Sequence, residues 1–218
     1  MEDAILGSYV FRHVIVDRAM VQLYIRGTLV ELRGQAADER ERDLIVNTVA
    51  KLVAPLKVDN RLFVDSAHRR GSDRWLAARI RSHLGMFAGL EPATLQVAVS
   101  STGIRLTGTA RSAEQRELTE RYVAALRAQR EVRNELTIAP DLPATSVKVD
   151  DASILAMLHQ VLQMMPATQG EPHELACRDG EVTINGAVAT AAEAELVSRL
   201  AGTVRGVKGV VNRLRVGS

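Results

Sequence analysis

The stretch Gly180-Glu-Val-Thr-Ile-Asn-Gly186, with Gly206-Val-Lys-Gly-Val-Val-Asn-Arg-Leu-Arg-Val216 after it, decides the fold of this chain. Apolar side chains recur at every second position in both motifs, which is typical of half-buried strands. The chain repeats the pattern three times without gaps, and each copy runs from a glycine to an asparagine: Gly34 to Asn60, Gly108 to Asn134 and Gly186 to Asn212. This constant spacing indicates tandem copies of one small unit.

A helix is expected between the two strands of each copy. A capping-box spacing follows every glycine, at Asp38 and Glu41, Ser112 and Gln115, and Thr190 and Glu193. In such a box the cap side chain accepts a hydrogen bond from the first turn, and the Glu or Gln reaches back to the N–H of the cap. We expect the helix to end near Pro55 in the first copy and near Gly206 in the third.

Each copy also begins with a hairpin, and its strongest signal is the Asp179-Gly180 turn. Before the second and third hairpins, helical spacing of apolar residues predicts a further helix, starting at Asp73 and at Asp151. The predicted fold class is therefore α+β: tandem small αββαβ sandwiches, each with a three-stranded mixed sheet and two helices on one face. The expected copies span residues 1–66, 72–139 and 148–218.

The first copy departs from this plan, because too few residues precede Gly34 for a full leading helix. Tyr9 to Val16 alternates as a strand would, although Ile5, Leu6, Tyr9 and Val10 also suit a helix containing Gly7. The alternation favours a strand. We expect the uncovered face of this incomplete unit to pack on another copy, another subunit or a ligand.

Composition argues against several classes of protein. Hydrophobic and charged residues make up 46% and 25% of the 218 residues, as in ordinary globular chains. A net charge of +2 and only 3% aromatic residues do not favour a nucleic-acid protein. The single cysteine, Cys177, excludes an intramolecular disulfide and is expected to be a buried thiol without a function.

Catalytic signatures are absent from the sequence. Its five histidines show no metal-ligand spacing, and there is neither a nucleophile elbow nor a phosphate-binding loop. Asp150 and Asp151 suit a helix start better than a chelating cluster. We therefore expect no enzyme activity, no metal and no cofactor.

The combination of Val-x-Leu-x-Gly, a capped helix and Gly-Val-x-x-Val-x-Asn-x-Leu-x-Val resembles the BON domain (bacterial OsmY and nodulation). The third copy matches almost fully. The second has Ala128-Gln-Arg-Glu-Val-Arg-Asn134 in place of the glycine-rich turn, and the first, with Pro55 and Leu56 there, is the least faithful. The resemblance implies a non-catalytic bacterial protein of envelope maintenance or stress, which binds phospholipid surfaces or partner proteins.

The repeated glycines and asparagines are interpreted as structural. The glycines (Gly34, Gly108 and Gly186) are expected to permit close packing or a bulge at a strand end. The asparagines (Asn60, Asn134 and Asn212) are expected to bond nearby backbone at the start of the last strand.

Two basic segments are candidate binding surfaces for an anionic lipid or partner. The first combines Trp75 with Arg69, Arg70, Arg74, Arg79 and Arg81, against one acid, Asp73. A cation near an anionic bilayer contributes about 1 kcal/mol, and Trp favours the headgroup boundary. The alternative is a solvated helix face with Trp75 packed between copies.

The second basic segment contains Arg205, Lys208, Arg213 and Arg215 and no acid. Strand alternation directs Arg213 and Arg215 away from Leu214 and Val216, toward the open side of the sheet. An anionic partner lying across that side would meet both arginines.

The expected partner is an anionic phospholipid or an envelope protein, and small modules favour a homo-oligomer. A self-assembling scaffold and a cytoplasmic ligand or ion sensor are the alternatives. Glu2 and Asp3 stand where a signal peptide needs positive charge, and no stretch is long enough to span a membrane. The sequence as it stands thus predicts a cytoplasmic protein, or a periplasmic one if a leader preceded residue 1.

Overall fold

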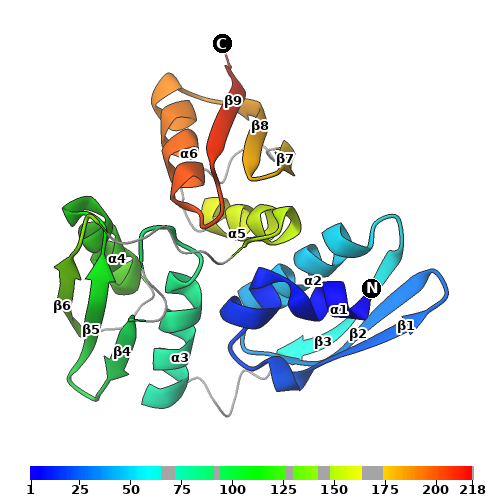
Figure 1. The fold of residues 1–218 in the computed structure, drawn as a ribbon, viewed down its shortest axis with the longest axis horizontal. Coiled ribbons are helices and arrows are strands. Elements are labelled where there is room, and N and C mark those ends of the chain that lie inside the picture. The colour runs from blue at the N-terminus through cyan, green and yellow to red at the C-terminus, as the bar shows by residue number, and fades with distance from the viewer. Residues whose placement is uncertain (65–71, 91–93, 126–129, 142–147, 164–173, 218) are drawn as a thin grey trace. The chain divides into compact units, whose positions relative to one another are not determined.

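The structure is a computed structural model that describes residues 1–64, 72–90, 94–125, 130–141, 148–163 and 174–217 (Figure 1). Its α-helices are α1 (Glu2–Gly7), α2 (Glu39–Val53), α3 (Asp73–Leu84), α4 (Ala113–Ala125), α5 (Asp151–Gln163) and α6 (Ala191–Thr203). Its strands are β1 (Val21–Arg26), β2 (Leu29–Ala36), β3 (Lys57–Val64), β4 (Gln96–Val99), β5 (Gly103–Ala110), β6 (Glu131–Ile138), β7 (Glu174–Arg178), β8 (Glu181–Val188) and β9 (Gly209–Val216).

The strands form three sheets of three strands, in the orders β1-β2-β3, β4-β5-β6 and β7-β8-β9. In each sheet the central strand pairs antiparallel with its hairpin partner and parallel with the last strand. The parallel pair is joined through a helix, which is the usual crossover connection between parallel strands. These mixed sheets with packed helices confirm the predicted α+β class.

The predicted helix starts are confirmed by their caps. Asp38 accepts a hydrogen bond from the Glu41 N–H at 2.8 Å, and Ser112 and Thr190 accept the equivalent bonds. The reach-back bond differs from the prediction, because the Glu or Gln accepts from the residue before the cap. Glu41, for example, accepts from the N–H of Ala37.

The glycine that closes β2 is required by the backbone. Gly34 has a φ of +107°, and a Cβ there would lie 2.0 Å from the carbonyl oxygen of Met20. Gly108 repeats the positive φ at the same place in the second sheet. The glycines thus let the chain entering the hairpin pass close to the central strand.

The asparagines fasten the last strand to the helix before it. Asn212 donates to the Ala194 carbonyl at 3.0 Å and accepts from the Leu214 N–H at 2.9 Å. Asn134 makes the equivalent bonds to Arg116 and Leu136. The asparagine stands inside the strand rather than at its start, because β6 and β9 begin three residues earlier.

The strand expected over residues 9–16 is wrong. The chain begins with α1 and then forms a π-helical turn, Val10–Val14. Ile5, Tyr9, Val10 and Val14 are buried at a helical spacing, so the burial of one helical face overrode the local alternation.

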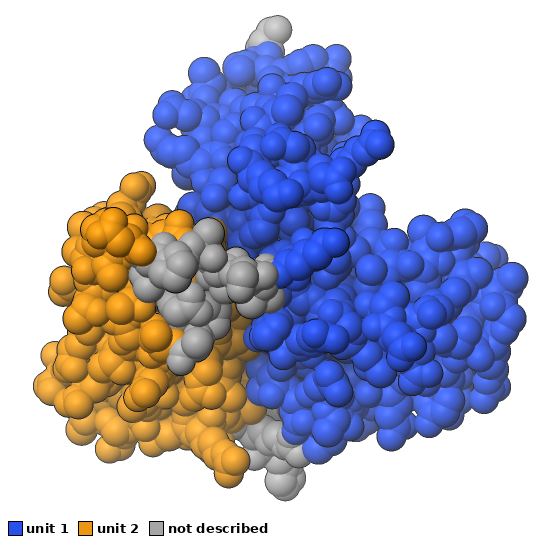
Figure 2. Space-filling view, in the orientation of Figure 1, with its two compact units in different colours: residues 1–64, 148–218 blue, residues 65–147 orange. Residues whose placement is uncertain are grey.

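Two compact units make up the chain (Figure 2): residues 1–64 with 148–218, and residues 65–147. Within the first unit, α5 packs against α2 as well as β7 and α6. Its side chains Ile154, Met157 and Leu158 are fully buried. Helix α2 of the first copy therefore packs on α5 of the third, whereas the expected cover of the first sheet's open side stays a prediction.

In the second unit, α3 packs on β4, and α4 packs on β5 and β6. Their apolar side chains close a core around Ile80, Leu84, Ile104 and Leu106. The opposite side of this sheet is lined by exposed side chains, such as Arg105 and Arg133. We call this side of each sheet its open face.

Candidate interaction surfaces

The open face of the first sheet carries a cluster of ion pairs. Glu31 has only 4% of its side chain exposed, because the guanidinium groups of Arg33 and Arg61 lie 2.8 and 3.0 Å from its carboxylate. The hydrogen bond from Arg33, helped by the positive charges of Arg33 and Arg61, holds the pKa of Glu31 below its ordinary value. Asp59 pairs with Arg61 at 2.9 Å, and Arg33 lies over the ring of Tyr24.

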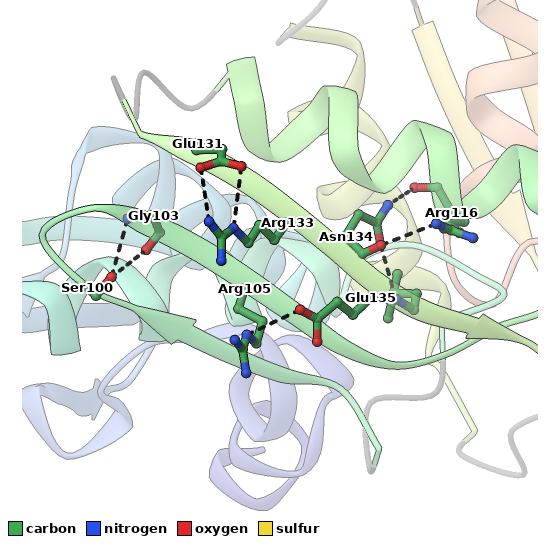
Figure 3. Close-up of polar contacts among 9 residues, drawn as sticks. Ser100, Gly103, Arg105, Arg116, Glu131, Arg133, Asn134 and Glu135 are labelled. Atoms are coloured by element: carbon green, nitrogen blue, oxygen red, sulfur yellow. Dashed lines mark hydrogen bonds and ion pairs between the residues drawn. The ribbon is translucent and has the colours of Figure 1, made fainter.

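Open-face ion pairs recur in the second sheet (Figure 3). The Arg105 guanidinium lies 3.4 Å from Glu135, and Arg133 lies the same distance from Glu131. The exposed fractions of Arg105 and Glu135 are 57% and 49%. Such solvated pairs contribute about 0–1 kcal/mol each, so these charges remain available to a partner.

The third sheet carries two arginines, Arg213 and Arg215, on its open face. Arg213 and Arg215 are exposed, and neither forms an ion pair with a carboxylate among the residues that the structure describes. Thr183 and Val211 occupy the positions of Glu31 and Asp59 in the first sheet. Arg213, the counterpart of Arg61, therefore lacks the two acidic neighbours that Arg61 has in the first sheet.

The other two members of the second basic segment lie apart from this face. Lys208 is exposed beside the β7–β8 turn, where its N–H donates to the Gly180 carbonyl at 2.9 Å. Arg205 is only 5% exposed, so its assignment to an exposed patch is wrong. It follows Ala201, the last buried residue of α6, and the buried Val204 just after that helix, and is buried with them.

The first basic segment lies mainly on α3. Arg74 and Arg81 are exposed, and within the described ranges neither pairs with a carboxylate. The Arg79 guanidinium lies 5.2 Å from the ring centre of Trp75, which is half-buried. Asp73 is already bonded to Arg130 at 2.6 Å. Arg69 and Arg70 fall outside the described residues.

The charge of α3 differs from that of the other helices. α2, α4 and α6 contain at least as many Asp and Glu as Arg and Lys, whereas α3 contains one acid and three arginines. Two of these helices each hold one arginine in an ion pair with a glutamate one turn earlier, Glu117 with Arg121 in α4 and Glu195 with Arg199 in α6. Helix α3 therefore presents the greatest excess of positive charge of the described α-helices.

The described residues do not favour a metal site or a nucleophilic cysteine. No group of three or more His, Cys, Asp or Glu side chains suited to a metal occurs in the described part of the chain. The thiol of Cys177 donates to Asp151 at 3.3 Å, and burial together with that carboxylate raises the pKa of Cys177 to about 12. The thiol is thus protonated at neutral pH, which disfavours nucleophilic attack.

Asp150 and Asp151 are occupied by structural bonds. Asp150 accepts from the Ser153 N–H and hydroxyl at the start of α5. Asp151 accepts from the N–H groups of Asp179 and Gly180 in the hairpin turn. Although burial of Asp151 opposes it, these bonds hold the pKa of Asp151 below its ordinary value.

Sequence reasoning missed the Glu31, Arg33 and Arg61 cluster. The signal was the spacing of Glu31 and Arg33 two residues apart in a strand, which places both on one face. The third member, Arg61, lies on the parallel strand β3. It could not be identified from the sequence, because its place beside Arg33 follows only from the register of the two strands.

No helix within the described residues is long and apolar enough to cross a membrane.

Comparison with known proteins identifies a family. The family model described as BON domain matches residues 72–140 and 150–218, which is more than half of the chain. The first copy lies outside both matches, although its sheet has the same order and register. No curated protein matches the chain significantly.

Two solved structures are similar at a low level. The C-terminal domain of CdsD, the structural protein of the type III secretion system of Chlamydia trachomatis, is 13% identical with a TM-score of 0.28, covering 100% of this chain and 95% of that one. The periplasmic domain of the inner membrane protein PrgH from S. typhimurium is 13% identical with a TM-score of 0.21, covering 92% and 95%. At these scores we draw no functional conclusion from them.

Proposed function

The chain belongs to the BON domain family, and we propose that it binds anionic phospholipid surfaces through helix α3. A BON domain suggests a binding role at a membrane or envelope. Lipid binding through α3 is supported above all by two exposed cations, Arg74 and Arg81. Neither has a carboxylate partner among the described residues. An anionic headgroup would supply that partner.

The aromatic ring beside these cations favours a bilayer surface. Trp75 is half-buried, so one part of its ring packs on the protein and another remains accessible. The guanidinium of Arg79 lies over the ring, which keeps a third positive charge near the same surface. Trp and Arg together suit the headgroup boundary, where an apolar ring and phosphate groups meet.

The expected affinity is modest and depends on salt. Each cation near an anionic surface contributes about 1 kcal/mol, and ions screen this attraction within about a Debye length. Binding through α3 should therefore weaken as salt is added and be absent for neutral vesicles.

Vesicle co-sedimentation with two matched variants tests the proposal. Arg74→Glu/Arg81→Glu reverses the exposed charges of α3, and Arg213→Glu/Arg215→Glu makes the same change in net charge on the open face of the third sheet. We expect phosphatidylglycerol vesicles to bind wild type and the second variant. The first variant should bind roughly 30-fold more weakly or worse, because two attractive terms of about 1 kcal/mol each are lost.

Three results would overturn this assignment. If the wild-type protein does not bind anionic vesicles, it has no lipid-binding surface of this kind. Selective loss in the Arg213→Glu/Arg215→Glu variant would transfer the site to the third sheet. Equal loss in both variants would mean that net charge, rather than α3, controls binding.

A further inference from the structure

The last strands of the first two sheets carry opposite charges at equivalent positions. On the open face, β3 presents Lys57, Asp59 and Arg61, and β6 presents Glu131, Arg133 and Glu135. Each residue of β6 follows Gly108 by the same number of residues as its counterpart in β3 follows Gly34. The sign sequence is therefore plus, minus, plus in β3 and minus, plus, minus in β6.

Both strands lie at an edge of their sheet. The strand orders leave one side of β3 and one side of β6 without a partner strand among the described residues. The two strands have the same length, eight residues each. An unpaired edge offers backbone N–H and C=O groups to another strand.

We propose that β3 of one chain pairs with β6 of a second copy of this chain. With Asp59 opposite Arg133, each of the three charged open-face positions of one strand meets the opposite charge on the other. The pattern is symmetric about its centre, so antiparallel pairing brings Lys57 opposite Glu135 and Arg61 opposite Glu131. Opposite charges at directly paired positions stabilise a two-strand ladder.

The same pattern disfavours pairing between identical strands. Two copies of β3 centred on Asp59 would place carboxylate against carboxylate and cations against cations. Two copies of β6 would do the same around Arg133. Like charges directly opposite each other are destabilising, so the charges select β3 with β6.

The third sheet does not offer an equivalent partner to β3. At the corresponding positions β9 has Gly209, Val211 and Arg213, so its one charge would meet Lys57 or Arg61. Because each chain has one β3 and one β6, the contact is heterologous and generates a ring or an open chain rather than a closed two-fold dimer.

A charge swap across the two strands tests the proposal by light scattering over a range of protein concentrations. Wild type should show a mass that rises above 23.8 kDa with concentration. Asp59→Lys and Arg133→Glu should each remain near the mass of one chain, because each places like charges at the centre of the contact. The double variant, with three cations facing three carboxylates, should associate again.

The matched control is Glu117→Lys/Arg121→Glu, which makes the same charge swap at an exposed ion pair of α4. It should associate as wild type does, and circular dichroism should show that every variant folds. A concentration-independent mass of one chain for wild type would overturn the proposal. So would single variants that associate normally, or a double variant that does not recover.

Discussion

The carboxylate of Asp150 accepts a hydrogen bond from the backbone N–H of Tyr9 at 2.9 Å, across 141 residues of sequence. Asp150 also accepts from Ser153 at the start of α5, and the Ser153 hydroxyl in turn accepts from the Val10 N–H. One acidic residue thus caps a helix of the third copy and fixes the helical start of the first.

Replacement of Asp150 by alanine should destabilise the unit formed by residues 1–64 and 148–218. The variant loses a cap, which costs about 0.5–2 kcal/mol, and leaves the Tyr9 N–H without its acceptor. Urea denaturation measures the change. Asp141→Ala, at an exposed aspartate, should stay within about 0.5 kcal/mol of wild type. Equal stability of the two variants would contradict this role of Asp150.

The buried carboxylate Glu41 should make part of the stability depend on pH. Burial raises the pKa of Glu41, although the N–H groups of Ala37 and Val16 donate to it. The folded state therefore holds the proton more tightly than the unfolded chain, so this contribution is complete below the ordinary pKa and is lost as pH rises through the raised one.

Comparison with Glu41→Gln isolates that effect. The advantage of wild type over the variant in unfolding free energy should be largest at acidic pH and should shrink toward neutral pH. Parallel urea titrations from acidic to neutral pH provide the measurement. An advantage that stays constant, or grows as pH rises, would show that the pKa of Glu41 is not raised.

Gly34 should not tolerate a side chain. Alanine at this position combines a φ of +107° with a Cβ 2.0 Å from the Met20 carbonyl oxygen, so the backbone must shift. We expect a loss of more than about 1 kcal/mol in thermal or chemical unfolding. Gly202→Ala is the control, because it lies in α6 with nothing within 4 Å of its Cβ, and it should stabilise by about 0.5–1 kcal/mol. A change in unfolding free energy of the same sign for both variants would refute this explanation.

The thiol of Cys177 should be unreactive while the protein is folded. With its pKa raised to about 12, little thiolate exists at mildly alkaline pH, and alkylation by iodoacetamide should be slow. Unfolding in urea should restore the rate of an ordinary cysteine. Equal rates for folded and unfolded protein would contradict a half-buried thiol that is bonded to Asp151.

Regular spacing made most of the fold predictable from the sequence. The capping residues Asp38, Ser112 and Thr190 and the glycine-closed strands identified the three sheets and the helices inside the copies. The start of the first copy was not predictable, because the apolar residues from Tyr9 to Val16 fit the spacing of a strand as well as that of a helix. Only burial against other elements decides between the two.

The candidate surfaces were predictable in part. Strand alternation correctly placed Arg213 and Arg215 among exposed side chains, but the burial of Arg205 depends on the packing at the end of α6. The opposite charges of Asp59 and Arg133 are visible in the sequence. A pairing between their strands could be proposed only once the strand order showed that both strands lie at sheet edges.

The fluorescence of Trp75 during titration with vesicles is the most direct test of the lipid surface. Trp75 is the one tryptophan of the chain, so the signal reports on α3 alone. We predict a blue shift with phosphatidylglycerol vesicles, reversal by added salt and no shift with neutral phosphatidylcholine vesicles. A spectrum that anionic vesicles leave unchanged would contradict the central claim that α3 binds the membrane surface.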